Sequence, residues 1–229
     1  MNKPYIICHM VTSLDGKVTG KFLYNSKCDK AHAIYYKLNR DYRANGYACG
    51  RVTMEGSFTG GWYPDLDAYS PLYDISDHLP EELSGFYAVA FDPHGRLGWR
   101  GTTIIDEDPG YDKAQIVEVL TRQVDPRYLR YLRSAEIPYI FAGETEIDVE
   151  LALRKLRDLF GIETLLLEGG SILDGAFQRA GVIDELSLVV APVVAGADGK
   201  PLFTDSVLEG YRLADVQRSD GVVWMNYKK

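Results

Sequence analysis

The stretch LLLEGGSILDGAF at residues 165–177 has the residue types and spacing of an anion-binding turn. A short apolar run predicts a buried strand, and Glu168 and two glycines follow it just before a predicted helix. Gly169 and Gly170 can bring bare backbone close to a ligand, and Ser171 is a candidate N-cap. The first N–H groups of a helix have no internal partner, so a phosphate would satisfy them. The alternative is a tight strand-to-helix connection without a ligand.

A second candidate anion site is GRVTMEGS at residues 50–57, directly after a short predicted strand. Gly50 permits a close turn into a helix, and Thr53 offers a hydroxyl and a free N–H in its first turn. Arg51 supplies a planar fork that matches a phosphate, although an arginine at a helix start is more often simply exposed. Two such turns in one chain predict a ligand with two phosphate groups.

The composition excludes several functional classes. The 229 residues are 46% apolar and 25% charged, as in one ordinary globular domain, and no apolar run of about 18 residues predicts a membrane span. Lys plus Arg number 25 against 33 Asp plus Glu, a net charge of −8 without a basic run, so we expect no nucleic-acid surface. The start of the chain lacks signal-peptide features, and the three cysteines are widely spaced. These features predict a single domain over residues 1–229 in the cytoplasm.

Hydrophobic periodicity indicates the elements that position the two turns. Residues 5–11 form a mostly apolar run typical of a central strand, and the spacing over 31–44 predicts an amphipathic helix. Asp148 and Gly161 are the expected start and stop signals of a helix over 149–160. Further strands are predicted at 47–49, 86–91, 137–141 and 164–167.

The order of these elements defines the fold class. Residues 137–167 read as strand, helix and strand, which predicts a parallel pair joined by a crossover. Residues 185–191 and 222–227 alternate without a long helix between them, which predicts an antiparallel edge. The expected fold is therefore α/β, with a mostly parallel mixed sheet flanked by helices and an antiparallel C-terminal edge. The loops at 59–84 and 99–112 are candidate binding rims.

Five motifs in order give the chain a family resemblance. They are TSLDGK at 12–17, GRVT at 50–53, FDPHGRL at 91–97, LLLEGGSIL at 165–173 and AGVIDELSLVVAPVVAG at 180–196. Their order and spacing resemble the reductase family typified by the C-terminal domain of the bifunctional riboflavin-pathway deaminase-reductase, which is itself dihydrofolate-reductase-like in fold. The deaminase zinc patterns H-x-E and P-C-x-x-C are absent, so we expect no metal site.

The resemblance implies NADPH as the cofactor. In such proteins a glycine pair and the residues after it lie under the cofactor pyrophosphate. The corresponding residues in this chain are Gly169, Gly170, Ser171, Ile172 and Leu173. The turn at Gly50, with Arg51 and Thr53, matches the one that grips the adenosine 2′-phosphate and pyrophosphate. Thr12 would border the nicotinamide, and Asp92 lies where the adenosine end is expected.

The implied reaction is hydride delivery to the ribose C1 of a small heterocyclic substrate, 5-amino-6-(5-phosphoribosylamino)uracil or a related pyrimidine, giving a ribityl chain. The reaction also needs a proton source, for which Glu168, Asp15 and His9 are the candidates. Each has a structural alternative: capping of the next helix for Glu168, closing of a turn for Asp15, and a satisfied core histidine for His9.

Two departures from the family pattern concern the substrate. The family usually carries a lysine at the position of His9 and an acid at that of Ser57. Because the carboxyl ends of the strands should meet at one crevice, we expect His9, Asp15, Ser57 and Glu168 around the nicotinamide edge. A pterin-type reductase and a non-catalytic NADPH-binding sensor are the alternative functions. The family also implies a homodimer, with residues 184–194 at the seam.

Overall fold

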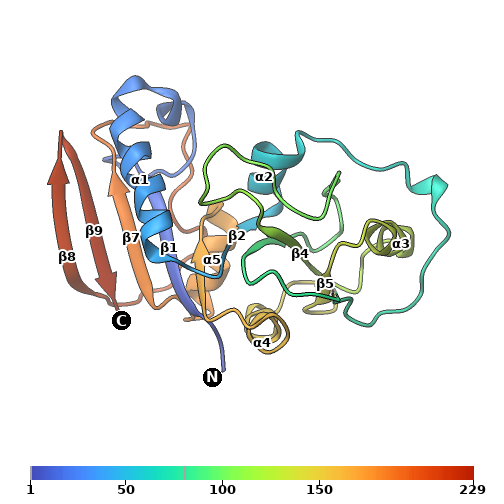
Figure 1. Ribbon diagram of the computed structural model, residues 1–229. Helices are drawn as coiled ribbons and strands as arrows, with labels where there is room; N and C mark the ends of the chain where they lie inside the picture. The colour runs from blue at the N-terminus through green and yellow to red at the C-terminus, as the bar shows by residue number, and fades with distance from the viewer. Residues whose placement is uncertain (1, 80) are drawn as a thin grey trace. The chain divides into compact units, whose positions relative to one another are not determined.

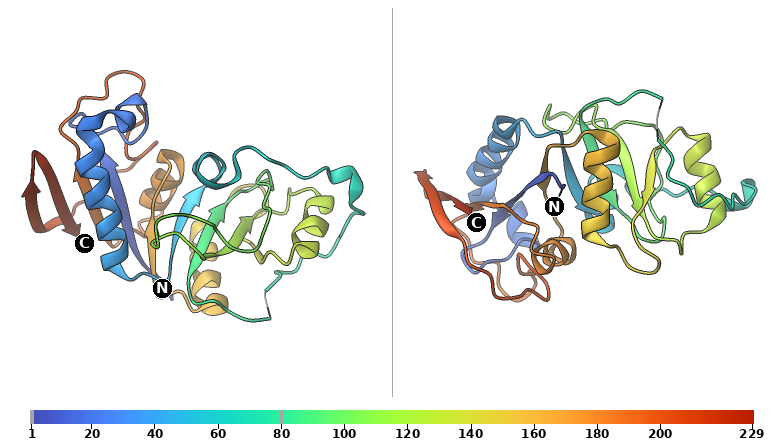
Figure 2. Two further views of the ribbon diagram at one scale, coloured as in Figure 1. Left: turned by 45° about the horizontal axis from the view of Figure 1, so that its top comes forward. Right: turned by 90° about the horizontal axis from the view of Figure 1, so that it is seen from below.

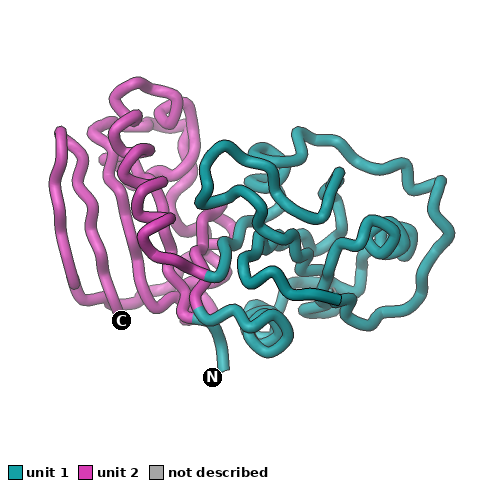
Figure 3. Tube along the Cα trace, viewed as in Figure 1, with its two compact units in different colours: residues 1–4, 45–163 teal, residues 5–44, 164–229 magenta. Residues whose placement is uncertain are grey.

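The computed structural model describes residues 2–79 and 81–229, and it contains two compact units (Figure 3). Unit 1 holds the N-terminal residues up to Pro4 and Asn45–Glu163, and unit 2 holds Tyr5–Ala44 and Thr164–Lys229. Both units are discontinuous in sequence, and the single reductase domain over 1–229 stays a prediction. Within the described residues, no helix has the length and apolar character needed to cross a membrane.

Unit 2 contains five strands in the order β6-β1-β7-β9-β8 (Figure 1). The first three are parallel, and β9 runs antiparallel to both β7 and β8, which confirms the predicted antiparallel C-terminal edge. The bounds are β1 Tyr5–Thr12, β6 Thr164–Leu167, β7 Glu185–Val190, β8 Arg212–Ser219 and β9 Val222–Lys228.

Two helices cover opposite faces of β1 in unit 2, α1 (Asp29–Tyr42) and α5 (Ser171–Arg179) (Figure 2). Every β1 residue after Tyr5 is buried, because both faces of the strand are covered. Side chains alternate along a strand, so His9 faces α1 while Cys8 and Met10 face α5. Two short 3₁₀ turns, Lys21–Tyr24 and Ser26–Cys28, precede α1.

Unit 1 contains four parallel strands in the order β5-β4-β3-β2. Their bounds are β2 Gly46–Gly50, β3 Tyr87–Phe91, β4 Gln115–Leu120 and β5 Tyr139–Phe141. The helices of this unit are α2 Arg51–Met54, α3 Pro126–Ser134 and α4 Val149–Phe160. Helix α2 continues as a π-helical turn over Glu55–Thr59, and a 3₁₀ turn covers Leu66–Ala68.

The signals predicted for α4 are confirmed. Asp148 Oδ1 accepts a hydrogen bond of 2.9 Å from the backbone N–H of Leu151, so this side chain caps the helix. Gly161 ends the helix with φ 68°, a left-handed conformation that glycine adopts without a steric cost.

Three elements lie where the sequence analysis expected none: β4, α3 and β8. The expected pairing of the two strands around α4 is also wrong, because β5 pairs with β4 and β6 pairs with β1. A local strand–helix–strand pattern predicts the direction of the strands, whereas their order in a sheet depends on contacts distant in sequence.

Candidate active site

In unit 2 the predicted anion-binding turn lies at the carboxyl end of β6. Glu168, Gly169 and Gly170 connect β6 to α5, and the peptide bond between the glycines is cis. Gly169 has φ 95°, and a Cβ there would lie 3.1 Å from the Met10 methyl carbon. The left-handed φ favours glycine, and a Cβ would also crowd the Met10 side chain.

The N-cap of α5 is Gly170, and the predicted capping role of Ser171 is wrong. Ser171 is the first residue of the helix and is buried. Its hydroxyl donates to the Pro201 carbonyl oxygen and lies 2.7 Å from Thr204 Oγ1. The hydroxyl therefore fastens the segment 201–204 to α5, while the helix start keeps backbone N–H groups without intrahelical partners.

The first residues of α5 offer backbone rather than side chains to an anion. Ile172 is two-thirds exposed, so the start of the helix reaches the surface. Ser171, Ile172 and Leu173 are the residues whose N–H groups an α-helix leaves without internal acceptors. Thr12, at the end of β1, is buried, and its carbonyl oxygen accepts a bond of 2.8 Å from the N–H of Ala191.

Glu168 is a buried acid immediately before the glycine pair. Its side chain accepts a hydrogen bond of 2.8 Å from Asn39 Nδ2 of α1, and both residues are buried. The carboxyl group is thereby oriented at the carboxyl end of β6, where open α/β sheets bind ligands.

His9 is completely buried and has both ring nitrogens bonded. Nε2 lies 3.0 Å from the Tyr35 carbonyl oxygen, and therefore donates; Nδ1 lies 2.9 Å from Ser187 Oγ, and therefore accepts. Trp224 Nε1 donates to the same Ser187 oxygen at 2.9 Å, and the His9 ring stacks on Tyr35 at 4.3 Å. Burial lowers the pKa of His9 to about 4, so the ring is neutral at pH 7. The geometry favours the core-histidine alternative over a proton source.

Asp15 ties two loops together. Its carboxylate accepts from the Ser13 hydroxyl at 2.6 Å and from the N–H groups of Ala195 at 2.8 Å and Gly196 at 3.1 Å. These bonds, first that from Ser13, lower the pKa of Asp15 to about 2. A carboxylate that stays ionised at neutral pH is a poor proton donor, so the geometry favours the loop-closing alternative.

The predicted residues of unit 1 gather after β2. Gly50 is the N-cap of α2, and the Arg51 guanidinium forms an ion pair of 2.8 Å with Glu55 one turn later. Thr53 is partly exposed in the first turn, and Ser57 is exposed in the π-helical turn. A phosphate would therefore have to compete with Glu55 for Arg51.

Asp92 lies at the end of β3, next to β2, and points into its own loop. It is fully buried, and its Oδ2 accepts from the backbone N–H groups of Arg96 and Leu97, the latter at 2.8 Å. Burial raises the pKa of Asp92 despite these bonds. The carboxyl group holds the turn at 92–97 together, an arrangement that argues against the predicted contact with a cofactor.

The same turn carries side chains that the sequence analysis did not select. A cavity of about 600 Å³ opens beyond the carboxyl ends of β3 and β4, and its lining includes His94, Arg96, Gln123 and Arg127. Arg96 is exposed. Its place as the basic residue of the FDPHGRL motif is the sequence signal that could have identified it. Arg127 is paired with Asp125, which also lines the cavity, so Arg96 is the candidate contact for an anionic ligand group.

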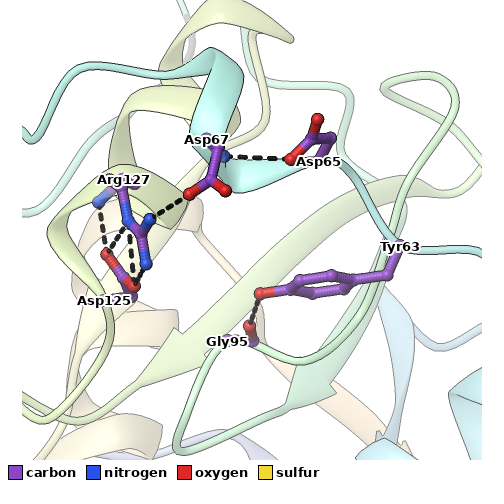
Figure 4. A network of polar contacts seen from close by, with 6 residues as sticks. All are labelled: Tyr63, Asp65, Asp67, Gly95, Asp125 and Arg127. Carbon is purple, nitrogen blue, oxygen red and sulfur yellow. Dashed lines mark hydrogen bonds and ion pairs between the residues drawn. The ribbon is translucent and has the colours of Figure 1, made fainter.

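The long loop at 59–84 is anchored to its own unit. Tyr63 donates a hydrogen bond of 2.7 Å to the Gly95 carbonyl oxygen, and Arg127 contacts both Asp125 and Asp67 at 2.7 Å (Figure 4). Further along, Arg133 bonds Asp74 and Lys155 bonds Asp77, each at 2.7 Å. These contacts hold the segments around Tyr63, Asp67, Asp74 and Asp77 against the rest of unit 1.

The fold, with its mostly parallel sheets and antiparallel C-terminal hairpin, defines a mixed α/β protein with a glycine-pair turn at a strand end. The family model described as the RibD C-terminal domain matches residues 97–224, more than half of the chain. The chain belongs to this family, as its motifs predicted.

The curated relatives share a name. The 2,5-diamino-6-ribosylamino-4(3H)-pyrimidinone 5′-phosphate reductase of Methanothermobacter thermautotrophicus is 36% identical over 93 residues, 40% of this chain and 42% of that protein. The enzyme of the same name from Aquifex aeolicus is 26% identical over 100 residues, 44% of this chain and 43% of the relative. The chain thus spans less than half the length of these relatives.

Solved structures support the fold. RibD of Acinetobacter baumannii superposes with a TM-score of 0.67 at 19% identity, covering 100% of this chain and 58% of that one. A pyrimidine reductase-like protein of Corynebacterium diphtheriae gives 0.69 at 17% identity, covering 99% and 92%.

Proposed function

We propose that this protein is an NADPH-dependent reductase that converts the ribose of a ribosylamino-pyrimidine phosphate to the ribityl form, as in riboflavin biosynthesis. The observation that carries the proposal is membership of the RibD C-terminal domain family, together with the glycine-pair turn built at the carboxyl end of β6. The substrate is 5-amino-6-(5-phosphoribosylamino)uracil or the 2,5-diamino-pyrimidinone phosphate named in the relatives.

NADPH would supply a hydride to the sugar C1. In unit 2, the backbone at Gly169 and Gly170 and the first N–H groups of α5 are suited to the pyrophosphate, because they combine close approach with the positive end of a helix dipole. In unit 1, Arg51 and Thr53 remain the proposed contacts of the phosphates, and Arg96 joins them as a cation of the neighbouring strand end.

Glu168 is the proposed proton source. Reduction of the ring-opened imine adds a hydride to C1 and a proton to nitrogen, so one acid must deliver a proton for each hydride transferred. His9 and Asp15 are engaged in structural bonds, so Glu168, at the carboxyl end of β6, is the candidate that we propose for this role. Asn39 orients its carboxyl group. Ser57 stays the proposed substrate contact of unit 1.

The proposal is tested by titration with NADPH, followed by nicotinamide fluorescence, and by NADPH oxidation with the two pyrimidine phosphates. We expect binding at sub-millimolar NADPH and turnover with one of the two. Glu168→Gln should lower kcat while NADPH affinity changes by no more than a few fold, because Glu168 holds no phosphate. Binding without turnover on either compound would contradict the reductase assignment.

We also propose a cytoplasmic homodimer. The expected seam at 184–194 needs revision, since β7 lies between β1 and β9 and both of its edges are used. β8 is the outermost strand, and all eight of its residues are exposed. A long exposed edge strand is an open template for pairing, so β8 is the proposed seam.

A further inference from the structure

Asp174, in the first turn of α5, is a buried acid that the proposed reaction does not use. The residue is completely buried. Neither of its carboxyl oxygens has a hydrogen-bond partner within the described chain. Buried polar groups are almost always paired, so a carboxyl group with two unpaired oxygens calls for a physical explanation.

The position of this carboxyl group links it to the predicted anion site. The N–H of Asp174 donates to the Gly170 carbonyl oxygen at 3.1 Å, and helical side chains tilt toward the N-terminus. Asp174 Oδ2 lies 3.7 Å from the place that a Cβ on Gly169 would occupy. The carboxyl group therefore lies beneath the glycine pair, behind the N–H groups that start α5.

The groups that face Asp174 offer it no positive charge. They are the Cys8 thiol of β1 and the Glu168 carboxyl of the turn. The segment 201–205 packs along α5 and contributes the Thr204 hydroxyl, bonded to Ser171, and the exposed carboxyl of Asp205. Arg179, at the far end of α5, bonds the carbonyl oxygens of that segment.

Burial, reinforced by the charge of Glu168, raises the pKa of Asp174 well above its ordinary value. Burial also raises the pKa of Cys8 and so favours the neutral thiol. Asp174 is thus a buried carboxyl group directly beneath this turn, and its surroundings favour the neutral acid.

We propose that Asp174 couples proton uptake to anion binding at the start of α5. The Asp174 carboxylate and a bound pyrophosphate would both lie against the positive end of the helix, where two negative charges repel. Binding of the anion therefore favours the neutral carboxylic acid, and Asp174 takes up a proton from solvent. The inference rests on the proposed function for the identity of the anion.

The sign of the pH dependence follows from linkage. A ligand that binds with proton uptake loses affinity as pH rises, by up to about tenfold per pH unit, between the pKa values of the free and bound states. Below the pKa of the free protein Asp174 is already neutral, and affinity no longer depends on its titration.

The experiment compares the NADPH dissociation constant of the wild type, Asp174→Asn and Asp205→Asn between about pH 6 and about pH 9. Asp205→Asn is the matched control, because it removes the same charge from an exposed side chain, and asparagine tolerates its φ of 54°. Titration of the 2′-phosphate is common to all three proteins and cancels in the comparison. Asp174→Ser serves if Asp174→Asn does not fold.

Between low and high pH, we expect the NADPH affinity of wild type and of Asp205→Asn to fall about tenfold more than that of Asp174→Asn. Asp174→Asn should bind NADPH as well as wild type does at low pH, and more tightly than wild type at high pH. Equal pH profiles for all three would overturn the coupling alone. No NADPH binding at any pH would overturn the proposed function and the coupling with it.

Discussion

At the scale of single residues, burial and hydrogen bonding decide what the titratable side chains of unit 2 can do. His9, Asp15 and Glu168 were all candidates for the proton source in the sequence, each with a structural alternative. In the structure, His9 is neutral and lies in a series of hydrogen bonds that runs from Trp224 through Ser187 to Tyr35. Three hydrogen-bond donors keep the Asp15 carboxylate ionised. Each role follows from neighbours that lie far away in sequence.

The first prediction concerns His9 and pH. Its pKa is lowered from 6.5 to about 4, so the unfolded chain takes up a proton that the folded protein resists. The stability due to this group is present above about pH 6.5 and is lost as pH falls toward 4, by at most about 3 kcal/mol. Urea unfolding at pH 7 and pH 5 should show a smaller pH effect in His9→Gln than in wild type.

The control for His9 is His94→Gln, which alters an exposed histidine in unit 1. It should keep the wild-type dependence of unfolding free energy on pH. An unchanged pH dependence in His9→Gln would show that His9 does not titrate differently in the folded and unfolded states.

The second prediction separates two cations in unit 1. If Arg51 contacts the 2′-phosphate, Arg51→Ala should weaken NADPH more than NADH by about 1.5 to 3 kcal/mol, because only NADPH loses a charge-assisted pair. If Arg96, which lines the cavity, contacts the 2′-phosphate instead, Arg96→Ala should weaken NADPH more than NADH and Arg51→Ala should not. Fluorescence titration of both cofactors measures the effect.

Arg130→Ala, an exposed change on α3, is the control and should leave the ratio of the two affinities unchanged. Equal weakening of NADPH and NADH by both Arg51→Ala and Arg96→Ala would assign the 2′-phosphate to neither side chain.

At the scale of elements, α5 is positioned by a close approach of the segment 201–205. A Cβ on Gly175 would lie 2.0 Å from the Thr204 carbonyl oxygen, so only glycine permits this contact. Ser171 bonds the same segment one turn earlier. The helix whose start is the proposed anion site is therefore held by contacts with a loop thirty residues later.

The third prediction tests this packing. Gly175→Ala must displace the backbone of the loop, and we expect it to destabilise the protein by about 1 to 3 kcal/mol. Gly56→Ala is the matched control in the π-helical turn, because a Cβ there meets open space, and alanine favours a helix. Chemical denaturation of both variants measures the difference, and equal stabilities would contradict the close approach.

At the scale of the whole molecule, the exposed edge of β8 is the feature most relevant to assembly. Leu213 and Val216 are about half exposed on this strand. The fourth prediction is that Leu213→Lys with Val216→Lys dissociates the proposed homodimer, because lysines on an edge strand disfavour strand pairing. Sedimentation of the wild type and the variant measures the mass of each.

Leu208→Lys is the control for this edge, since Leu208 is also exposed in unit 2 but lies outside β8. It should leave the oligomeric state unchanged. A wild-type protein that sediments as a monomer at micromolar concentration would contradict the homodimer.

The sequence by itself determined the local structure and the family. The apolar run of β1, the capping residues Asp148 and Gly161, and the glycine pair before α5 are local signals, and the structure places strands, a helix and a turn where they predicted. Such signals work because strand and helix periodicity and the steric freedom of glycine depend on a few neighbouring residues.

Only the tertiary structure decided strand order and the roles of the acids. β8 escaped detection because all its residues are exposed. No local pattern identifies the pairing of β5 with β4 or of β6 with β1. The sequence likewise could not distinguish the buried Asp174 or Asp92 from exposed acids. Burial and hydrogen bonding set the charge of a carboxyl group, and both arise from residues that are brought together only when the chain folds.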